Sequence, residues 1–314
     1  MAKIGLWISL FVLFVLAIVF GFQKPIGSWL YQIGVEQQAS TNSAGSIGDG
    51  LHLGLCGTGS PLPNLDRAGP CNFILAGEQL FIVDIGQGGS RNLSLMGVNA
   101  GNVEGLFLTH FHSDHVDGMG PLMLMHWVSE SNTSPLRVYG PSGVEKVVAG
   151  FNAAYAMDAT YRTAHHGERI APSSGFGAEA HLFPMDNETS VVFDQGGLKV
   201  TAFTVPHNPV EPAVGYRFDY KGRSVCISGD TEKSVNLERA CSGVDLIVHE
   251  ALQPAMVTQI QDQMELMGNE SGAKIMLDIK DYHASPEDAA KSAQAAGADM
   301  LVLSHLVPPL PNSY

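Results

Sequence analysis

The sequence predicts an α/β protein in which helices and strands are stacked in layers. Short apolar runs bounded by Gly, Asp and Asn, the pattern of buried strands, recur in two blocks along the 314-residue chain. Helical segments lie between these runs, so two sheets with helices packed against them are expected. Polar side chains suited to chemistry follow several of the strands directly. Because strand ends lead into the loops at one edge of an α/β fold, a functional site is expected at that edge.

The first element is an apolar run over residues 4–22 that contains no charged residue. As a helix with a rise of about 1.5 Å per residue it would span about 28 Å, close to the roughly 30 Å of a bilayer core. Residues 21–24 contain no small-residue cleavage signal, so an uncleaved single-pass anchor is preferred to a cleaved signal peptide. Lys3 and the amino terminus precede the run, which predicts a cytoplasmic N-terminus and a catalytic domain outside the cytoplasm.

The chain is accordingly divided into three parts. Residues 1–24 are the predicted membrane anchor, residues 25–48 a flexible linker, and residues 49–314 the folded domain. None of the four cysteines lies in a C-x-x-C pair, which disfavours a thiolate metal site. Buried free thiols are one alternative. Disulfides are the other if the domain is extracytoplasmic, and the local pairing would be Cys56–Cys71 with Cys226–Cys241.

Strands account for most of the recognisable elements of the domain. The first block has runs over Leu51–Leu55, Asn72–Leu75, Leu80–Val83 and Gly105–Thr109, and the second over Leu198–Val205, Val214–Phe218, Ser224–Ile227, Asp245–Val248 and Met300–Leu303. The clearest helix begins after Ser285, which can cap it, and ends at Gly297. A second helix is expected over residues 143–156. Residues 164–187 are weakly patterned and are interpreted as a surface loop or a lid over the site.

The strongest chemical signal is a histidine-rich segment directly after the strand that ends at Thr109. Four potential metal ligands lie within six residues: His110, His112, Asp114 and His115. Alternate residues of an extended segment point to the same side, and imidazole and carboxylate groups suit zinc, with manganese or iron as alternatives. Three further residues of the same types follow later strands: His207, Asp230 and His305. All of these side chains can meet at one edge of the sheets.

These residues, in this order, resemble the metallo-β-lactamase fold superfamily over roughly residues 49–314. The family pattern is an Asp after an early strand, an H-x-H-x-D-H cluster, a later His, a later Asp and a final His. The chain has these residues at Asp84, His110, His112, Asp114, His115, His207, Asp230 and His305. The resemblance implies a four-layer αββα sandwich with a dinuclear site holding two divalent metal ions, zinc being favoured. It also implies a homodimer as one option.

The resemblance further implies a role for each residue. The first metal would be held by His110, His112 and His207, the second by Asp114, His115 and His305, and Asp230 would bridge the two. Asp84 would orient the cluster by hydrogen bonding. The segments Gly57–Pro61, Ser228–Thr231 and His249–Ala251 resemble the branch that contains tRNA 3′-processing endonucleases and arylsulfatase-like hydrolases. The catalytic residues implied by that branch are Asp114, Glu250 and His283, of which Glu250 and His283 would assist the leaving group.

Two features argue against tRNA as a partner. The two strands predicted between His207 and Asp230 leave no room for the tRNA-binding arm of the processing enzymes. The chain also has 17 Lys and Arg against 31 Asp and Glu, a net charge of −14, and so lacks the basic footprint of a nucleic-acid binder, although a local patch could escape this count. Nucleic acid is therefore not an expected partner.

The sequence thus favours a membrane-anchored hydrolase of phosphate or sulfate esters, with a small anionic ester as substrate and a metal-bridging hydroxide as nucleophile. An Asp at position 230, where zinc β-lactamases have Cys, argues against β-lactamase activity. Three alternatives stay open: a tRNA 3′-processing endonuclease, a carboxylic ester or lactone hydrolase on the same site, and a metal-binding domain without turnover.

Overall fold

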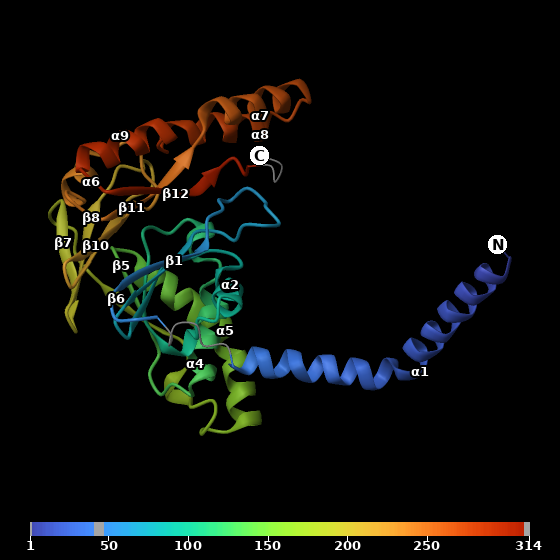
Figure 1. Cartoon of the computed structure of the whole chain (residues 1–314). Helices are drawn as coiled ribbons and strands as arrows, with labels where there is room; N and C mark the ends of the chain where they lie inside the picture. The colour runs from blue at the N-terminus through green and yellow to red at the C-terminus, as the bar shows by residue number, and fades with distance from the viewer. Residues whose placement is uncertain (1, 41–46, 311–314) are drawn as a thin grey trace. The chain divides into compact units, whose positions relative to one another are not determined.

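The structure is a computed structural model that describes residues 2–40 and 47–310 (Figure 1). It divides into two compact units, Met1–Gly45 and Ser46–Tyr314. The described part of the first unit is a single helix, α1 (Ala2–Ser40), with Pro25 inside it. Residues 25–40 are therefore helical where a flexible linker was expected, because Pro25 and the polar residues after it do not end the helix. Residues 41–46 of that predicted linker lie outside the described residues.

The membrane anchor predicted over residues 4–22 is corrected by the structure. A membrane span needs sufficient length and sufficient hydropathy in the same helix. Over residues 2–40 and 47–310, no helix combines the two. The finding overturns the predicted single-pass anchor, the membrane as a partner of the chain, and the orientation of the domain that was inferred from the anchor.

The second unit contains two mixed sheets of six strands each. In the first sheet the strands are adjacent in chain order: β1 (Leu51–Gly57), β2 (Cys71–Ala76), β3 (Gln79–Ile85), β4 (Val103–Phe107), β5 (Leu136–Gly140) and β6 (Ala178–Leu182). Strands β1 to β3 pair antiparallel, and the pairs from β3 to β6 are parallel. The meander followed by parallel strands places the C-terminal ends of β3 and β4 side by side.

The second sheet repeats this plan. Its strands in chain order are β7 (Thr189–Gln195), β8 (Leu198–Thr204), β9 (Val214–Tyr220), β10 (Arg223–Ile227), β11 (Leu246–Leu252) and β12 (Met300–Val307). Strands β7 to β10 pair antiparallel, and β10, β11 and β12 are parallel. The parallel part therefore carries the C-terminal ends of three strands to one edge.

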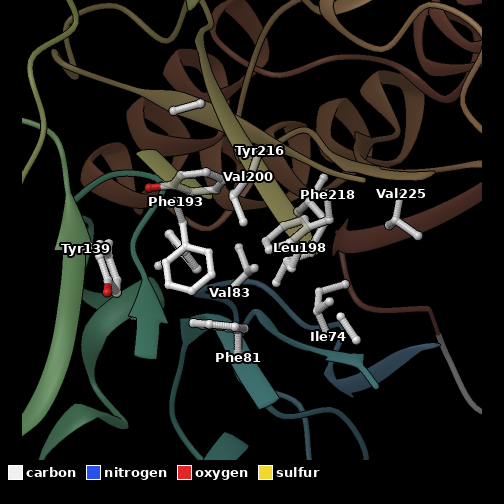
Figure 2. Packing of buried hydrophobic residues seen from close by; sticks show 14 of the residues in the cluster. Ile74, Phe81, Val83, Tyr139, Phe193, Leu198, Val200, Tyr216, Phe218 and Val225 are labelled. Atoms are coloured by element: carbon white, nitrogen blue, oxygen red, sulfur yellow. The ribbon is translucent and has the colours of Figure 1, made fainter. Parts of the chain in front are cut away.

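Aromatic side chains from both sheets form the core between them (Figure 2). Phe81 of β3 packs edge-on against Phe193 of β7, with ring centroids 4.9 Å apart. Phe107 of β4 lies 5.2 Å from Tyr216 of β9. Such aromatic contacts add to the free energy gained by burying the rings. The two sheets therefore pack face to face.

Helices cover the outer faces of both sheets. The first sheet is contacted by α2 (Gly89–Leu95), α4 (Met119–Ser129) and α5 (Val144–His166), and α3 (Ser113–Val116) lies beside β3. The second is contacted by α6 (Val235–Ala240) and α9 (Pro286–Ala296), while α7 (Pro254–Leu266) and α8 (Glu270–Asp278) pack on each other. The layers are thus helix, sheet, sheet and helix, the αββα sandwich that the resemblance implied.

The two disulfides have the local pairing among the alternatives considered. Cys56 is bonded to Cys71 and Cys226 to Cys241, and the Cα atoms are 5.0 and 5.9 Å apart.

The segment 164–187 has more regular secondary structure than the expected surface loop or lid would have. It contains the end of α5, a short 3-10 turn (Ser173–Gly175) and strand β6.

Candidate metal centre

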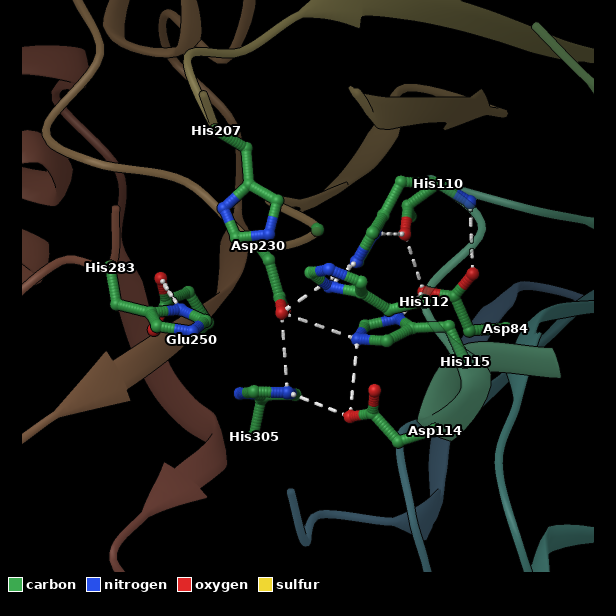
Figure 3. Close-up of polar contacts among 12 residues, drawn as sticks. Asp84, His110, His112, Asp114, His115, His207, Asp230, Glu250, His283 and His305 are labelled. Atoms are coloured by element: carbon green, nitrogen blue, oxygen red, sulfur yellow. Dashed lines mark hydrogen bonds and ion pairs between the residues drawn. The ribbon is translucent and has the colours of Figure 1, made fainter. Parts of the chain in front are cut away.

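The predicted metal ligands converge at one edge of the two sheets (Figure 3). Among the residues that the structure describes, three overlapping sets of side chains offer ligand atoms that lie within 4.8 Å of one another, and one of them joins His283 to Asp230 and His305. The first ligand group consists of His110, His112, His207 and Asp230, and the second ligand group of Asp114, His115 and His305. Asp230 lies between the groups, with its Oδ2 3.8 Å from His110 Nε2 and 3.3 Å from His305 Nε2. Residues far apart in the sequence thus form one polar cluster.

Unusual backbone conformations help to present these side chains. Asp84 and His305 have positive φ angles of 55° and 46°, in the left-handed region that non-glycine residues rarely adopt. Gly229, directly before Asp230, has a φ of 63°, and a Cβ at this position would lie 2.7 Å from the carbonyl oxygen of Val214. Such conformations persist only where the surrounding structure holds them, and they are concentrated at functional sites.

Asp84 is buried and makes hydrogen bonds to the segment that carries the histidine cluster. Its Oδ1 accepts a hydrogen bond from the Thr109 backbone N–H at 2.9 Å, and its Oδ2 accepts one from the Thr109 hydroxyl at 2.8 Å. The same Oδ2 lies 2.8 Å from Nδ1 of His115. A proton on Nδ1 leaves Nε2 of His115 free to act as a ligand atom. Sequence reasoning did not identify Thr109 as part of this network, although its position beside His110 was a signal.

Tyr282 is a second residue that sequence reasoning missed. Its backbone carbonyl accepts a hydrogen bond from His207 Nδ1 at 2.9 Å, and its ring centroid lies 4.7 Å from that of His207. The bond fixes the imidazole so that Nε2 faces the first ligand group. The identity of the side chain at position 282 could not reveal this contact, because any residue can supply a backbone carbonyl.

Glu250 and His283 form a buried pair beside the ligand groups. His283 Nδ1 lies 2.9 Å from Glu250 Oε1, which also accepts the backbone N–H of Ala284 at 3.0 Å and of Thr231 at 3.2 Å. Burial lowers the pKa of His283, but the charge and hydrogen bond of Glu250 outweigh it and raise the pKa to about 9. His283 therefore carries a proton at neutral pH, and its Nε2–H is available to other groups.

Burial and charge set the protonation of the ligand groups. Burial lowers the pKa of His110 well below its ordinary value and that of His207 to about 4, so both imidazoles are neutral. Burial raises the pKa of Asp230, but the nearby His305 and His115 outweigh it and hold that pKa well below its ordinary value. Burial lowers the pKa of His115, but Asp230 and Asp84 outweigh it and hold that pKa well above its ordinary value. Neutral imidazole and ionised carboxylate are the forms that bind metal ions, so His115 would release a proton when a metal binds.

The donor set fits divalent metal ions. Among the residues that the structure describes, four buried atoms of the two groups have no hydrogen-bond partner: His115 Nε2, His207 Nε2, His305 Nδ1 and Asp230 Oδ1. Buried polar atoms normally have a partner, and buried carboxylates need a compensating positive charge. Imidazole and carboxylate groups at this spacing are ordinary ligands of zinc and related metals.

A cleft of about 490 Å³ opens beside the second ligand group. Its lining includes Asp114 at one side, and the side chains of Arg67 and Arg91 bring positive charge to the same cleft. Arg67 also donates a hydrogen bond to the Thr58 hydroxyl at 2.7 Å. The lining also contains Asp117, and the cleft adjoins the second ligand group through Asp114.

The fold and the donor set together define the class of protein. The sequence matches the family described as a β-lactamase superfamily domain over residues 87–306, and the chain belongs to this superfamily, as its metal-binding motif indicated. Its relatives include the ribonuclease Z of Mycobacterium bovis (strain BCG / Pasteur 1173P2), which is 35% identical over 260 residues that cover 82% of this chain and 86% of the relative. The ribonuclease Z of Mycobacterium avium (strain 104) is 36% identical over 262 residues, covering 83% of this chain and 87% of the relative.

Solved structures share the same fold. Human tRNase Z, short form, matches with a TM-score of 0.60 at 22% identity, covering 81% of this chain and 92% of that protein. The metallo-β-lactamase fold protein YhfI from Bacillus subtilis matches with a TM-score of 0.57 at 18% identity, covering 82% and 87%. At these identities the structural likeness supports the fold alone.

The relatives overturn the main functional expectation from the sequence. Proteins named ribonuclease Z match over most of the chain, which contradicts a membrane-anchored hydrolase of small phosphate or sulfate esters and the exclusion of nucleic acid. Net charge sums the whole surface and so does not report the charge at one site; the lining of the cleft beside the site, for example, contains Arg67 and Arg91 together with Asp114 and Asp117. The short β9–β10 hairpin is present between His207 and Asp230, as predicted.

Proposed function

We propose that the chain is a metal-dependent ribonuclease of the ribonuclease Z type, which hydrolyses phosphodiester bonds in precursor tRNA. One observation carries the proposal: buried His and Asp ligand groups adjoin the Glu250–His283 pair, in a chain that aligns with ribonuclease Z over most of its length. The ligand assignment is the one that the sequence implied. The first ligand group would bind one ion, the second would bind the other, and Asp230 would contact both.

Zinc is the metal that we assign to the site. Imidazole-rich sites with a minority of carboxylates favour zinc over magnesium or calcium, which prefer oxygen ligands. Two such ions, when bound, would supply Lewis-acid stabilisation of the phosphoryl oxygens and activation of a water nucleophile. Asp84 and the Tyr282 carbonyl would keep His115 and His207 in the tautomers that present Nε2.

The Glu250–His283 pair would act on the leaving oxygen. His283 holds a proton on Nε2 while its Nδ1 is engaged by Glu250, so it would serve as general acid when the phosphorus–oxygen bond breaks. Glu250 is 3% exposed and its Oε1 accepts backbone hydrogen bonds, so it would hold the imidazole ring in place and not exchange protons with solvent. The arginine side chains at the cleft would attract the RNA backbone.

The experiment that tests the proposal measures metal content and RNA cleavage on the same preparations. Metal-loaded wild-type protein should contain zinc by elemental analysis and should cleave a precursor tRNA with a 3′ trailer. Asp230→Asn should lose both metal and cleavage, because its carboxylate lies between the ligand groups. Asp194→Asn, which changes an exposed carboxylate of β7, is the matched control and should retain both. Metal-loaded wild-type protein that leaves the precursor intact would contradict the proposal.

A further inference from the structure

Both disulfides close segments that carry or support the candidate metal centre. Cys56–Cys71 closes the first loop, residues 57–70, and Cys226–Cys241 closes the second loop, residues 227–240. Each bridges a sequence separation of 15 residues, and all four cysteine side chains are buried. The hydrolytic chemistry proposed above uses none of these sulfur atoms, so their placement needs a separate explanation.

The first loop supports the second ligand group. The carbonyl oxygen of Thr58 accepts a hydrogen bond at 3.1 Å from the backbone N–H of Leu306, the residue directly after His305. At the other end of the loop, a Cβ built on Gly69 would lie 3.1 Å from the carbonyl oxygen of Asp114. The backbone of the first loop therefore packs against the chain at two of the three ligands of that group.

The second loop belongs to the first ligand group. It carries Asp230 itself, four residues beyond Cys226. The backbone N–H of Glu232 donates to the carbonyl oxygen of Pro206 at 3.0 Å, which ties this loop to the residue before His207. The loop returns through α6, capped by Ser234, to Cys241. The disulfide therefore closes the segment that sets Asp230 against His207.

We propose that the two disulfides are positioning elements of the metal centre, one for each ligand group, so that the thiol redox state of the chain sets its affinity for metal ions. Reduction by a dithiol breaks one S–S bond and yields two thiols, while the dithiol gives up two electrons and two protons and closes to a cyclic disulfide. Without the cross-link the loop ends can separate, and ligands that were preorganised must be ordered when the metal binds.

The inference rests on the proposed function only in requiring that the site binds metal. The sequence separation of 15 residues is the same in both loops, so the loss of either bond frees a segment of similar length.

Cysteine-pair variants of the full chain test the inference. Cys56→Ala with Cys71→Ala should weaken binding of one of two zinc ions about 10- to 100-fold, the range seen when groups that orient metal ligands are removed. Cys226→Ala with Cys241→Ala should weaken both ions, because Asp230 lies between the two ligand groups. Zinc affinity is measured by competition with a chromogenic chelator, on protein whose folding is checked by circular dichroism.

A core variant separates positioning from general stability. Trp127→Phe removes buried volume from a hydrophobic cluster that contains no residue of either loop, so it should leave zinc affinity unchanged while lowering stability. If both cysteine-pair variants bound two zinc ions with wild-type affinity, the inference would be wrong. An equal loss of affinity in Trp127→Phe would also overturn it, since loss of stability would then explain the effect.

The wild-type chain provides a second readout that does not depend on variants. One sample is reduced with dithiothreitol, alkylated and freed of reductant, and the other is left oxidised. Limited proteolysis should cut residues 57–70 and 227–240 in the reduced sample and spare them in the oxidised one. Equal cleavage of both samples would contradict the positioning role. Failure of the oxidised chain to bind zinc at all would instead contradict the proposed function.

Discussion

At the scale of single residues, removal of the His283 imidazole should slow the reaction without changing the metal content. It lies against Glu250 and belongs to neither of the two ligand groups defined above, although one of its ring nitrogens also lies within 4.8 Å of ligand atoms of Asp230 and His305. We expect His283→Ala to lower the rate of RNA cleavage by about 10²- to 10⁴-fold, the usual contribution of a general acid. Elemental analysis should find the wild-type metal content. His166→Ala, at the exposed end of α5, is the control that should keep the full rate.

The His283–Glu250 pair also predicts how the stability of the metal-free protein depends on pH. The folded-state pKa of His283 is raised to about 9 from the ordinary value of 6.5. A raised pKa means that the stabilising contribution is complete below pH 6.5 and is lost as the pH rises through about 9. The loss should be on the order of 3 kcal/mol.

Urea unfolding of chelator-treated protein at pH 6 and at pH 9.5 measures this effect. Other histidines of the cluster titrate as well, so the informative quantity is the difference between wild type and His283→Gln at each pH. That difference should be large at pH 6 and small at pH 9.5. A difference that stayed constant with pH would show that the pair does not titrate in this range.

The ligands could be predicted from the sequence because each is a metal-binding residue type placed after a strand, in the order of a known family. The contacts that orient them could not be predicted in the same way. Thr109 acts through its backbone N–H and hydroxyl, and Tyr282 through its carbonyl. Such contacts depend on how remote segments meet in space, and residue type alone does not reveal them.

At the scale of elements, predictions succeeded where a segment has a strong local pattern. The helix α9 begins after Ser285 and is followed by Gly297 in the left-handed conformation, as its capping residues indicated. The structure adds three strands to those predicted: β5, β6 and β7. Strands β6 and β7 are edge strands with partly exposed side chains, so they lack the continuous apolar run that marks a buried strand. The five-residue β5 is buried but has an exposed Arg137 in its short sequence.

The cap of α9 gives a prediction at this scale. The Ser285 side chain accepts the backbone N–H of Asp288 at 3.1 Å, and the helix begins three residues after His283. Ser285→Ala should lower the free energy of unfolding by about 1 kcal/mol, the usual cost of losing such a cap. Chemical denaturation measures the change, with Ser134→Ala, an exposed serine outside the helices, as the control. A loss equal to that of the control would show that the cap contributes little.

At the scale of the whole molecule, composition was a poor guide to partners. The net charge of −14 describes the chain as a sum, whereas an RNA substrate would meet the field at one cleft. Several of the acidic residues are buried at the site itself, namely Asp84, Asp114, Asp230 and Glu250. They count as negative charge in the composition. Divalent ions bound by the two ligand groups would nevertheless make the charge at the site more positive, and this is the charge that an anionic substrate would encounter.

Metal removal should therefore destabilise the whole folded unit and not only stop its chemistry. Bound ions stabilise the folded state by mass action, by about 2.7 kcal/mol when free metal is at 100 times its dissociation constant. Without them, Asp114 and Asp230 remain close to each other in a buried cluster, compensated only by histidines. We expect chelation to lower the melting temperature and zinc to restore it in a concentration-dependent manner. Asp230→Asn should melt at the same temperature with and without zinc. If the melting temperature of the wild-type protein were also independent of zinc, the ligand groups would not bind the metal. The buried atoms of His115, His207 and His305 that lack a hydrogen-bond partner would then need another explanation.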